Sequence, residues 1–169
     1  MGKNKLVFVS IIMLVALFGC QPATLTYYKG ANAEDMDVVS LTASQKEVQN
    51  WQDLYVTVDY NLEKNGDQVD IDGVLTFSHS PKVNYTRVRD LKLKLFFLNK
   101  DLRVVDYLDI ARTLSTDLED ETRFSKSIRI SPDVIALTFG YEGSFYDSDP
   151  EHPSSDMVWK LPKRNAQSK

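Results

Sequence analysis

Apolar side chains recur at every second residue over several segments of this chain, and this alternation restricts its fold more than any other feature. In residues 54–62 the alternate apolar positions are Leu54, Val56, Val58, Tyr60 and Leu62. Successive side chains of a β-strand point to opposite faces, so this period predicts a strand with one buried and one exposed face. A helix would instead repeat its apolar positions every three or four residues.

The next residues predict a β-hairpin. Asn65-Gly66 follows the first strand, and a second alternating segment runs from Val69 to Phe77. Asn-Gly is the strongest short hairpin signal, because both residues tolerate the positive φ that a type I′ turn requires at its two central positions. The sequence therefore predicts a type I′ turn at Asn65-Gly66 that joins two antiparallel strands.

Five more segments have the pattern of strands, namely residues 91–98, 102–110, 124–130, 134–142 and 156–161. In the first of them the odd-numbered residues from Leu91 to Phe97 form the predicted core face, and Lys92 and Lys94 point outward. Phe96 and Leu98 then make both faces apolar. Phe139 and Trp159 are expected to be large members of the core. The tight turn 99–101, the loop 78–86, the polar connection 112–123 and the long loop 143–155 separate these segments.

About seven strands with short turns predict an all-β fold, a single antiparallel β-sandwich of immunoglobulin-like type. A short N-terminal helix is expected from Ser44 to about Gln52, because Ser44-Gln45-Lys46-Glu47 matches the S-x-x-E capping box. Val48 and Trp51 would share one face of this helix. The sandwich domain is expected over residues 44–163, with a polar tail at 164–169 and a tether at 20–43 that is extended or packs in part on the domain.

Residues 93–105, with the sequence L-K-L-F-F-L-N-K-D-L-R-V-V, resemble the central hairpin of FxLYD-type and related immunoglobulin-like modules of bacterial lipoproteins. Asn99 and Leu102 occupy the positions where those modules usually have Asp and Gly. The resemblance implies the sandwich fold and a family of unknown function. It implies no activity, because sandwiches carry many unrelated functions.

The first twenty residues have the features of an export signal. Lys3 and Lys5 precede an apolar run from Leu6 to Phe18, which is about 13 residues long and short of the ~18–20 that a membrane-spanning helix needs. The run ends at Leu17-Phe18-Gly19-Cys20, which resembles the lipobox of bacterial lipoproteins. The resemblance implies cleavage after residue 19, acylation of Cys20 and a lipid anchor in the cell envelope. Gln21 after the cysteine favours the outer membrane, with the domain facing the periplasm or the cell surface.

Composition supports the export of one compact domain. Cys20 is the only cysteine, so the domain has no internal disulfide. The chain carries 20 basic and 24 acidic side chains, and removal of the signal with Lys3 and Lys5 makes it more acidic. An acidic domain offers no electrostatic basis for binding nucleic acid. After cleavage about 150 residues remain, which is the usual length of one domain.

The sequence contains no recognisable catalytic or metal-binding motif. Its two histidines, His79 and His152, fall in predicted loops beside Ser or Pro, and no nucleophile motif accompanies them. Clustered carboxylates in residues 117–121 and 147–156 lack the fixed spacing of a calcium loop. We therefore expect neither an enzyme nor a cofactor, and no metal site.

The loop 143–156 is the predicted contact site for a partner. Its aromatic pair offers apolar area and its carboxylates offer a negative rim; the residues are Phe145, Tyr146, Asp147, Asp149 and Glu151. The alternative is that the two aromatic rings cover the end of the core. The sequence thus predicts a non-catalytic envelope lipoprotein that acts in protein–protein interaction or envelope assembly. The second hypothesis is a small-ligand or Ca²⁺-binding module that uses the same loop.

Overall fold

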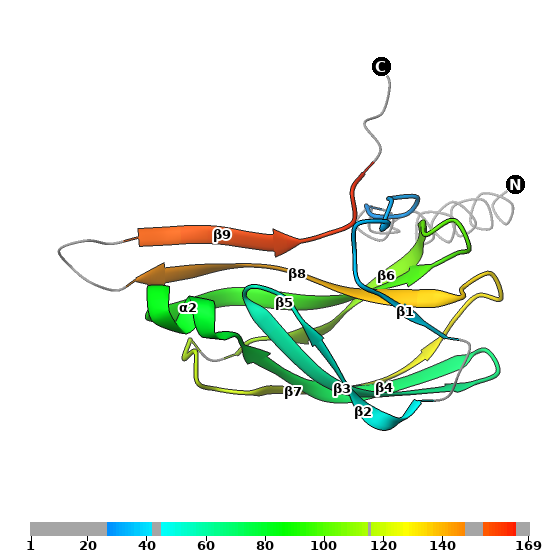
Figure 1. Cartoon of the computed structure of the whole chain (residues 1–169), viewed down its shortest axis with the longest axis horizontal. Helices are drawn as coiled ribbons and strands as arrows, with labels where there is room; N and C mark the ends of the chain where they lie inside the picture. The colour runs from blue at the N-terminus through cyan, green and yellow to red at the C-terminus, as the bar shows by residue number, and fades with distance from the viewer. Residues whose placement is uncertain (1–26, 42–44, 115, 148–153, 165–169) are drawn as a thin grey trace, which may run out of the picture.

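The chain folds as a β-sandwich (Figure 1). The computed structural model describes residues 27–41, 45–114, 116–147 and 154–164. Within these ranges it contains one short helix, α2 (His79–Asn84), and nine strands. The strands are β1 (Val38–Ser40), β2 (Gln45–Gln52), β3 (Val56–Asn65), β4 (Gln68–Phe77), β5 (Arg87–Leu98), β6 (Val104–Arg112), β7 (Thr122–Arg129), β8 (Ala136–Asp147) and β9 (Ser154–Lys160).

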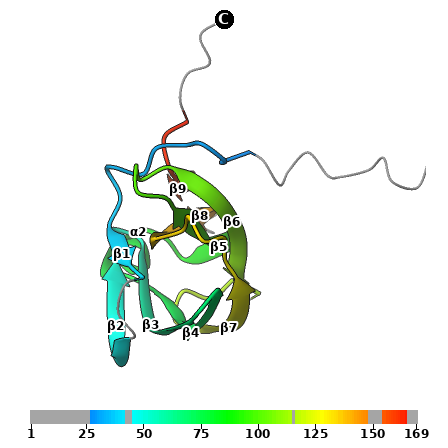
Figure 2. The same ribbon diagram turned by 90° about the vertical axis from the view of Figure 1, so that its right-hand side faces the viewer.

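The strands form two antiparallel sheets that face each other (Figure 2). The four-stranded sheet has the order β2-β3-β4-β7. In the five-stranded sheet β6 pairs with β5 and β5 with β8, and the far side of β8 pairs with β1 at one end and β9 at the other. Hairpins stay within a sheet, whereas β1–β2, β4–β5, β6–β7 and β7–β8 join one sheet to the other, as connections do in immunoglobulin-like sandwiches. The predicted fold class is confirmed.

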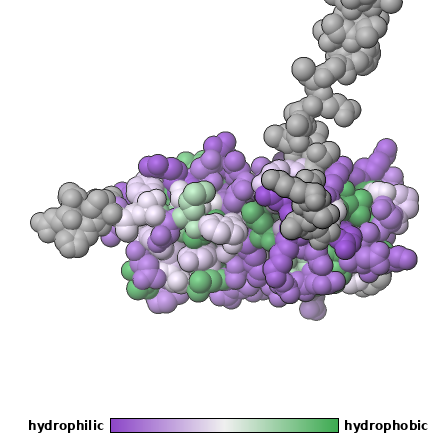
Figure 3. All heavy atoms as spheres, turned by 90° about the horizontal axis from the view of Figure 1, so that it is seen from above, coloured by the Kyte–Doolittle hydropathy of each residue, from purple (hydrophilic) through white to green (hydrophobic). Residues whose placement is uncertain are grey.

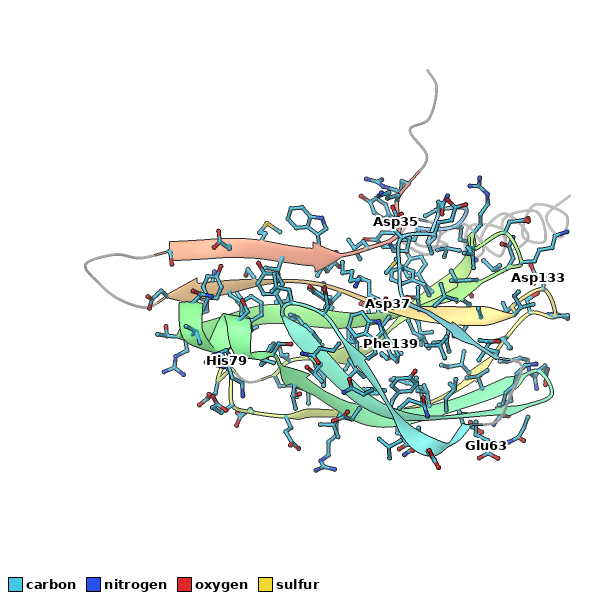
Figure 4. All side chains as sticks on the ribbon, viewed as in Figure 1. Asp35, Asp37, Glu63, His79, Asp133 and Phe139 are labelled. Atoms are coloured by element: carbon cyan, nitrogen blue, oxygen red, sulfur yellow. The ribbon has the colours of Figure 1, made fainter. Side chains whose placement is uncertain are left out.

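The alternating residues fill the space between the sheets, as their period predicts. Val56, Val58 and Leu62 of β3 are buried there, as are Leu91, Leu93 and Leu95 of β5. Phe139 of β8 is fully buried and lies between the two sheets (Figure 4). The prediction for Trp159 was wrong, because this side chain is 66% exposed. It stands on the outer face of β9, whereas the neighbouring Val158 points into the core.

The hairpin between β3 and β4 is confirmed, but its turn is of another type. Asn65 pairs with Gln68, so Gly66 and Asp67 are the two central residues. Gly66 has φ of +64°, whereas Asn65 and Asp67 do not have a positive φ. A positive φ at the first central position alone is the pattern of a type II′ turn, so the predicted type I′ turn is wrong. Both types suit a hairpin because both match the twist of the strands.

Two local predictions of secondary structure were wrong, one of a helix and one of a loop. Residues 45–52, expected to be helical, form strand β2, which pairs with the edge of β3 and buries Trp51 opposite Val58. Val48, the other residue of the predicted helix face, is exposed. Conversely, the expected loop 78–86 contains α2, in which Pro81 occupies the first turn, where its missing N–H removes no helical hydrogen bond.

Residues 27–41, expected to belong to a tether, are part of the sandwich. Tyr28, Ala31 and Ala33 are buried over the outer face of the five-stranded sheet, where they form a second core cluster with Phe96 and Leu98. Backbone hydrogen bonds hold this covering segment to residues 102–104 and to Lys163, and β1 then pairs with β8. The alternative, that part of the tether packs on the domain, is therefore what the structure shows.

This covering segment also changes the environment of Lys94, which was expected to point into solvent. Lys94 lies on the same outer face as Phe96 and is buried. Its ammonium group contacts Asp109 Oδ1 at 2.7 Å and Glu142 Oε1 at 3.0 Å, and the ring of Tyr28 lies 6.0 Å away. Lys94 is thus on the predicted outer face of the strand, but chain from a distant part of the sequence covers it and shields it from solvent.

Strand β8 extends to Asp147, five residues beyond its predicted end at Glu142. Gly143 permits this extension. A Cβ atom at this position would lie 2.7 Å from Leu91 Cα, because β5 changes register between Arg89 and Lys92, where Asp90 has a φ of +50°. The long loop expected at 143–155 is correspondingly shorter, and its central residues 148–153 lie outside the described part of the chain.

Among the described residues, no helix is both long and apolar enough to cross a membrane. The predicted signal peptide 1–19 and Cys20 lie outside these residues, as does nearly all of the polar tail 164–169. The tight turn after Asn99 is confirmed. Leu102 has a φ of +52° there, the conformation that Gly adopts most easily, at the position where the FxLYD-type pattern usually has Gly.

Candidate functional site

In the predicted partner loop, the main aromatic anchor lies inside the core. Phe145 is fully buried in β8, with the rings of Tyr55 and Tyr85 stacked on it at 5.6 and 5.5 Å. Tyr146 and Asp147 are half-buried residues of the same strand. Asp149 and Glu151 lie outside the described residues. The alternative, that an aromatic ring covers the end of the core, holds for Phe145.

The most distinctive exposed surface is on the neighbouring strand, β9. Met157 is 75% exposed and Trp159 is 66% exposed, both on the outer face of the five-stranded sheet. Across the strand pair, Met157 lies opposite Ser144 and Trp159 lies opposite Glu142. Figure 3 looks onto this face, where apolar and pale residues stand among hydrophilic ones. Adjacent exposed apolar side chains of this size are typical of interaction sites.

Basic side chains from β5 continue this surface. Arg89 pairs with Ser144 and Lys92 pairs with Glu142, so both lie in the same rows as Met157 and Trp159. The guanidinium of Arg89 stands 5.1 Å from the ring centroid of Tyr146, a cation–π contact. We call this surface the β9 face; its residues are Arg89, Lys92, Ser144, Tyr146, Met157 and Trp159. The predicted partner loop has a negative rim, whereas this face carries apolar and basic side chains.

Contacts on the inner side hold β9 in place. Val158 is buried in the main core. Lys160 reaches Asp37 at 3.0 Å and Asp53 at 3.6 Å, and its ammonium group lies 5.3 Å from the ring centroid of Trp51. Since Asp53 and Trp51 belong to the four-stranded sheet and its β2–β3 turn, these contacts fix β9 across the opening between the sheets. The β9 face is therefore held to the core and to both sheets from its inner side.

A hydrogen bond between Tyr141 and Asp53 strengthens this support. The Tyr141 hydroxyl donates to Asp53 Oδ2 at 2.7 Å. Burial acts to raise the pKa of Asp53, but the hydrogen bonds from Tyr141 and the Leu54 backbone, with the charge of Lys160, hold it below its ordinary value. Burial and the nearby Asp53 raise the pKa of Tyr141 far above its usual range. At neutral pH the carboxylate is thus ionised and the phenol protonated, which gives a charge-assisted bond.

The backbone edge of β9 is also regular, and the strand carries two charged residues, Asp156 and Lys160. The register of β2 against β3 shifts between Gln45 and Gln49, and that of β6 against β5 shifts twice. Strand β7 has an unbroken register but carries three basic residues, Arg123, Lys126 and Arg129. Such irregularities and charges discourage a second strand from pairing. Strand β9 pairs with β8 over seven consecutive residues without a shift and has no Pro.

A concave region lies between the edges of β6 and β7, which are adjacent in Figure 2. Its volume is about 360 Å³, and its lining includes the apolar side chains of Phe97, Val105, Leu108 and Ile128. Lys29–Asp106 and Arg129–Asp67 ion pairs lie at or beside it. A small ligand would have space in this region.

The remaining polar candidates do not converge. His79 is exposed at the start of α2 (Figure 4), and His152 lies outside the described residues. In the part of the chain that the structure describes, no three His, Cys, Asp or Glu side chains are grouped as metal ligands. The carboxylates of residues 117–121 make local contacts instead: Glu119 pairs with Lys82, and Asp117 accepts a hydrogen bond from the backbone of Glu119.

One sequence signal for the β9 face was present. Met157 and Trp159 are two residues apart with Val158 between them, so a strand here must expose either Val158 or the larger pair. The sequence predicts Trp159 in the core, whereas the structure buries Val158 and exposes Met157 and Trp159. No protein-family model matches the chain, and a search of the curated proteins finds no match.

Proposed function

We propose that this protein is a membrane-anchored, non-catalytic lipoprotein of the cell envelope that binds another protein through the β9 face. The observation that carries the proposal is the combination on β9 of a regular open edge with exposed Met157 and Trp159. Proteins commonly bind a partner by adding a strand of the partner to an exposed sheet edge. Main-chain hydrogen bonds then supply affinity, and flanking side chains supply specificity. Aromatic and Arg residues, both present on this face, are enriched among the residues that dominate binding energy.

Anchoring through acylated Cys20, in the outer membrane and facing the periplasm or the cell surface, is part of the proposal. The packing of residues 27–41 on the sandwich supports a short connection to the membrane. About seven residues would separate Cys20 from Tyr27, which extend at most roughly 25 Å. The sandwich would then stay close to the bilayer, where its partners would share the same surface. Membership of an FxLYD-like lipoprotein family would agree with this arrangement.

Substitution Cys20→Ala should abolish the anchor. We expect the variant to keep its signal segment, to incorporate no radiolabelled palmitate and to accumulate as the unprocessed form. The conservative control is Cys20→Ser, which keeps the size of the side chain but lacks the sulfur that is acylated. Normal maturation and lipid incorporation in Cys20→Ala would show that Cys20 is not the anchor.

Photo-crosslinking in native membranes tests the partner-binding face. We expect that replacing Met157 with a photoreactive amino acid gives one or a few discrete crosslinked products. Val48 on β2 provides a matched control, because it is 66% exposed at the edge of the other sheet. The photoreactive amino acid at position 48 should give no discrete crosslinked product. Equal labelling from both positions, or none from position 157, would contradict binding through the β9 face.

A further inference from the structure

We propose that the partner at β9 is a second copy of this chain, which pairs antiparallel with it, edge to edge, about a two-fold axis at Val158. This inference rests on the proposed role of the β9 face and names its occupant. Two five-stranded sheets would then join into one continuous sheet across the axis. A two-fold contact of this kind is self-complementary and closed, so it yields a dimer rather than a filament.

The order of residues in β9 supports this pairing. With Val158 opposite itself, Met157 lies opposite Trp159 of the second copy, and Asp156 lies opposite Lys160. Each pair occurs twice by symmetry. Residues directly opposite each other on neighbouring strands have Cβ atoms about 4.5–5.5 Å apart, so these side chains would be in contact. The strand is therefore complementary to its own reversed sequence about Val158.

On the outer side, the two large exposed side chains would cover each other. Met157 and Trp159 share the outer face of the sheet and are 75% and 66% exposed. A thioether beside an indole is a favourable contact. The pairing would remove from water the two most exposed large apolar groups of β9, which the single chain leaves uncovered.

On the inner side, the pairing places opposite charges together. The exposed carboxylate of Asp156 accepts a hydrogen bond from the Tyr85 hydroxyl at 2.5 Å. Lys160 already contacts Asp37 and Asp53, so its charge is offset there and an additional carboxylate gains little attraction. The opposite-charge pair therefore contributes mainly to the choice of register.

Neighbouring registers lose both kinds of pair. An axis at Met157 would put Trp159 opposite Ser155 and Asp156 opposite Val158. An axis at Trp159 would put Val158 opposite Lys160 and Met157 opposite Leu161. Pro162 has no N–H to donate, so pairing ends at Leu161 in every register. Only the axis at Val158 places Met157 opposite Trp159 and Asp156 opposite Lys160.

Such an edge contact is small, and the proposed anchor would make it effective. Two anchored copies share one membrane plane, which raises their effective concentration in the way that a linker does. The dimer should therefore be tested in the full chain in its native membrane.

Cysteine crosslinking tests the axis and its register. We expect the Val158→Cys variant to form a disulfide-linked dimer on mild oxidation, because opposite residues have Cα atoms about 4.5–5.5 Å apart, within disulfide range. The Met157→Cys variant should give about tenfold less dimer, because its symmetry mate is a diagonal neighbour roughly 7–8 Å away. The double variant Met157→Cys with Trp159→Cys should crosslink, because these residues face each other. The unsubstituted chain, which has only Cys20, is the control for disulfides at that position.

The outcomes separate this inference from the proposed function. Dimers from Val158→Cys and from the double variant, with little from Met157→Cys, would support the pairing. The double variant also serves if Val158→Cys fails to fold, because its substitutions are at exposed sites. The pairing would be overturned if neither Val158→Cys nor the double variant formed a dimer. It would also be overturned if Met157→Cys alone gave as much dimer as Val158→Cys. If position 157 photo-crosslinks to a different protein while no such dimer forms, the second copy is excluded and the partner-binding role stands.

Discussion

Replacing Tyr28 with Ala should lower the free energy of unfolding by about 3–5 kcal/mol, the usual cost of truncating a large buried aromatic side chain. Tyr28 lies in the segment that the sequence assigned to a tether, yet only 6% of it is exposed. Its ring packs edge-on against Phe96 at 5.3 Å and Tyr107 at 4.9 Å. Burial, with a smaller contribution from Glu142, raises the pKa of Tyr28 to about 12, as expected for a phenol withdrawn from water.

The adjacent Tyr27 gives a matched control. Tyr27 is 52% exposed, and its main contact beyond Tyr28 is the guanidinium of Arg164 at 4.1 Å from its ring. We expect Tyr27→Ala to cost about 1 kcal/mol or less, the range of an exposed cation–π contact. Urea denaturation of the two variants, followed by tryptophan fluorescence, measures the difference. If both substitutions cost equally little, residues 27–36 do not belong to the folded unit.

Neutralising both carboxylates beside Lys94 should cost about 3 kcal/mol, near the lower end of the range for breaking a buried ion pair. The variant is Asp109→Asn with Glu142→Gln. It leaves the Lys94 ammonium, whose side chain is 6% exposed, without a negative partner. The cost stays at the lower end because Asp109 and Glu142 are themselves half exposed and partly screened by water.

Lys94→Met provides the control for this ion pair. Methionine keeps the buried volume, and the two half-exposed carboxylates left behind stay hydrated. We therefore expect a change of under about 1 kcal/mol, as found when buried ion pairs are replaced by apolar groups. A Lys94→Met variant that is as unstable as the double variant would contradict this account, because the loss would then not come from an unpaired buried charge.

The pH dependence separates the two variants further. In the natural chain, burial acts to lower the pKa of Lys94, but Asp109 and Glu142 outweigh it and raise this pKa above the ordinary lysine value. Lys94 then stabilises the fold below that ordinary value, and the contribution is lost only as pH rises through the raised pKa. Without the carboxylates burial alone acts and lowers the pKa. The double variant should thus become more stable as pH rises from 7 to about 9, where the natural chain gains nothing from this group.

The strands were predictable because their side chains alternate on a period that is a local property of the backbone. Val56, Val58, Tyr60 and Leu62 are buried where the period placed them. Gly66 was correctly assigned to the turn, but the turn type depended on which residues paired across it. Pairing of Asn65 with Gln68, rather than of their neighbours, moved the central positions by one residue.

The exposed surface was less predictable, because exposure depends on which other segments cover a strand. The alternation allowed either face of β9 to be buried, and the core took Val158 and left Trp159 outside. The sequence analysis places Phe145 in the long loop 143–155, but it lies in β8. The register shift of β5 at Asp90 instead brings the Leu91 backbone over Gly143 and continues the strand.

By itself, the sequence determined that the chain forms antiparallel strands in a sandwich, because a period of two permits burial on one face of a strand only. It also contained a sign of the second core, since Phe96 and Leu98 made the outer face of β5 apolar. Only the tertiary structure decided what covers that face, why Lys94 is buried and why residues 45–52 are a strand. Each of these depends on contacts between segments far apart in the chain: residues 27–36 on β5, and β2 on the edge of β3. Local propensities of about 1 kcal/mol or less per residue cannot determine such contacts, because the burial gained on pairing is larger.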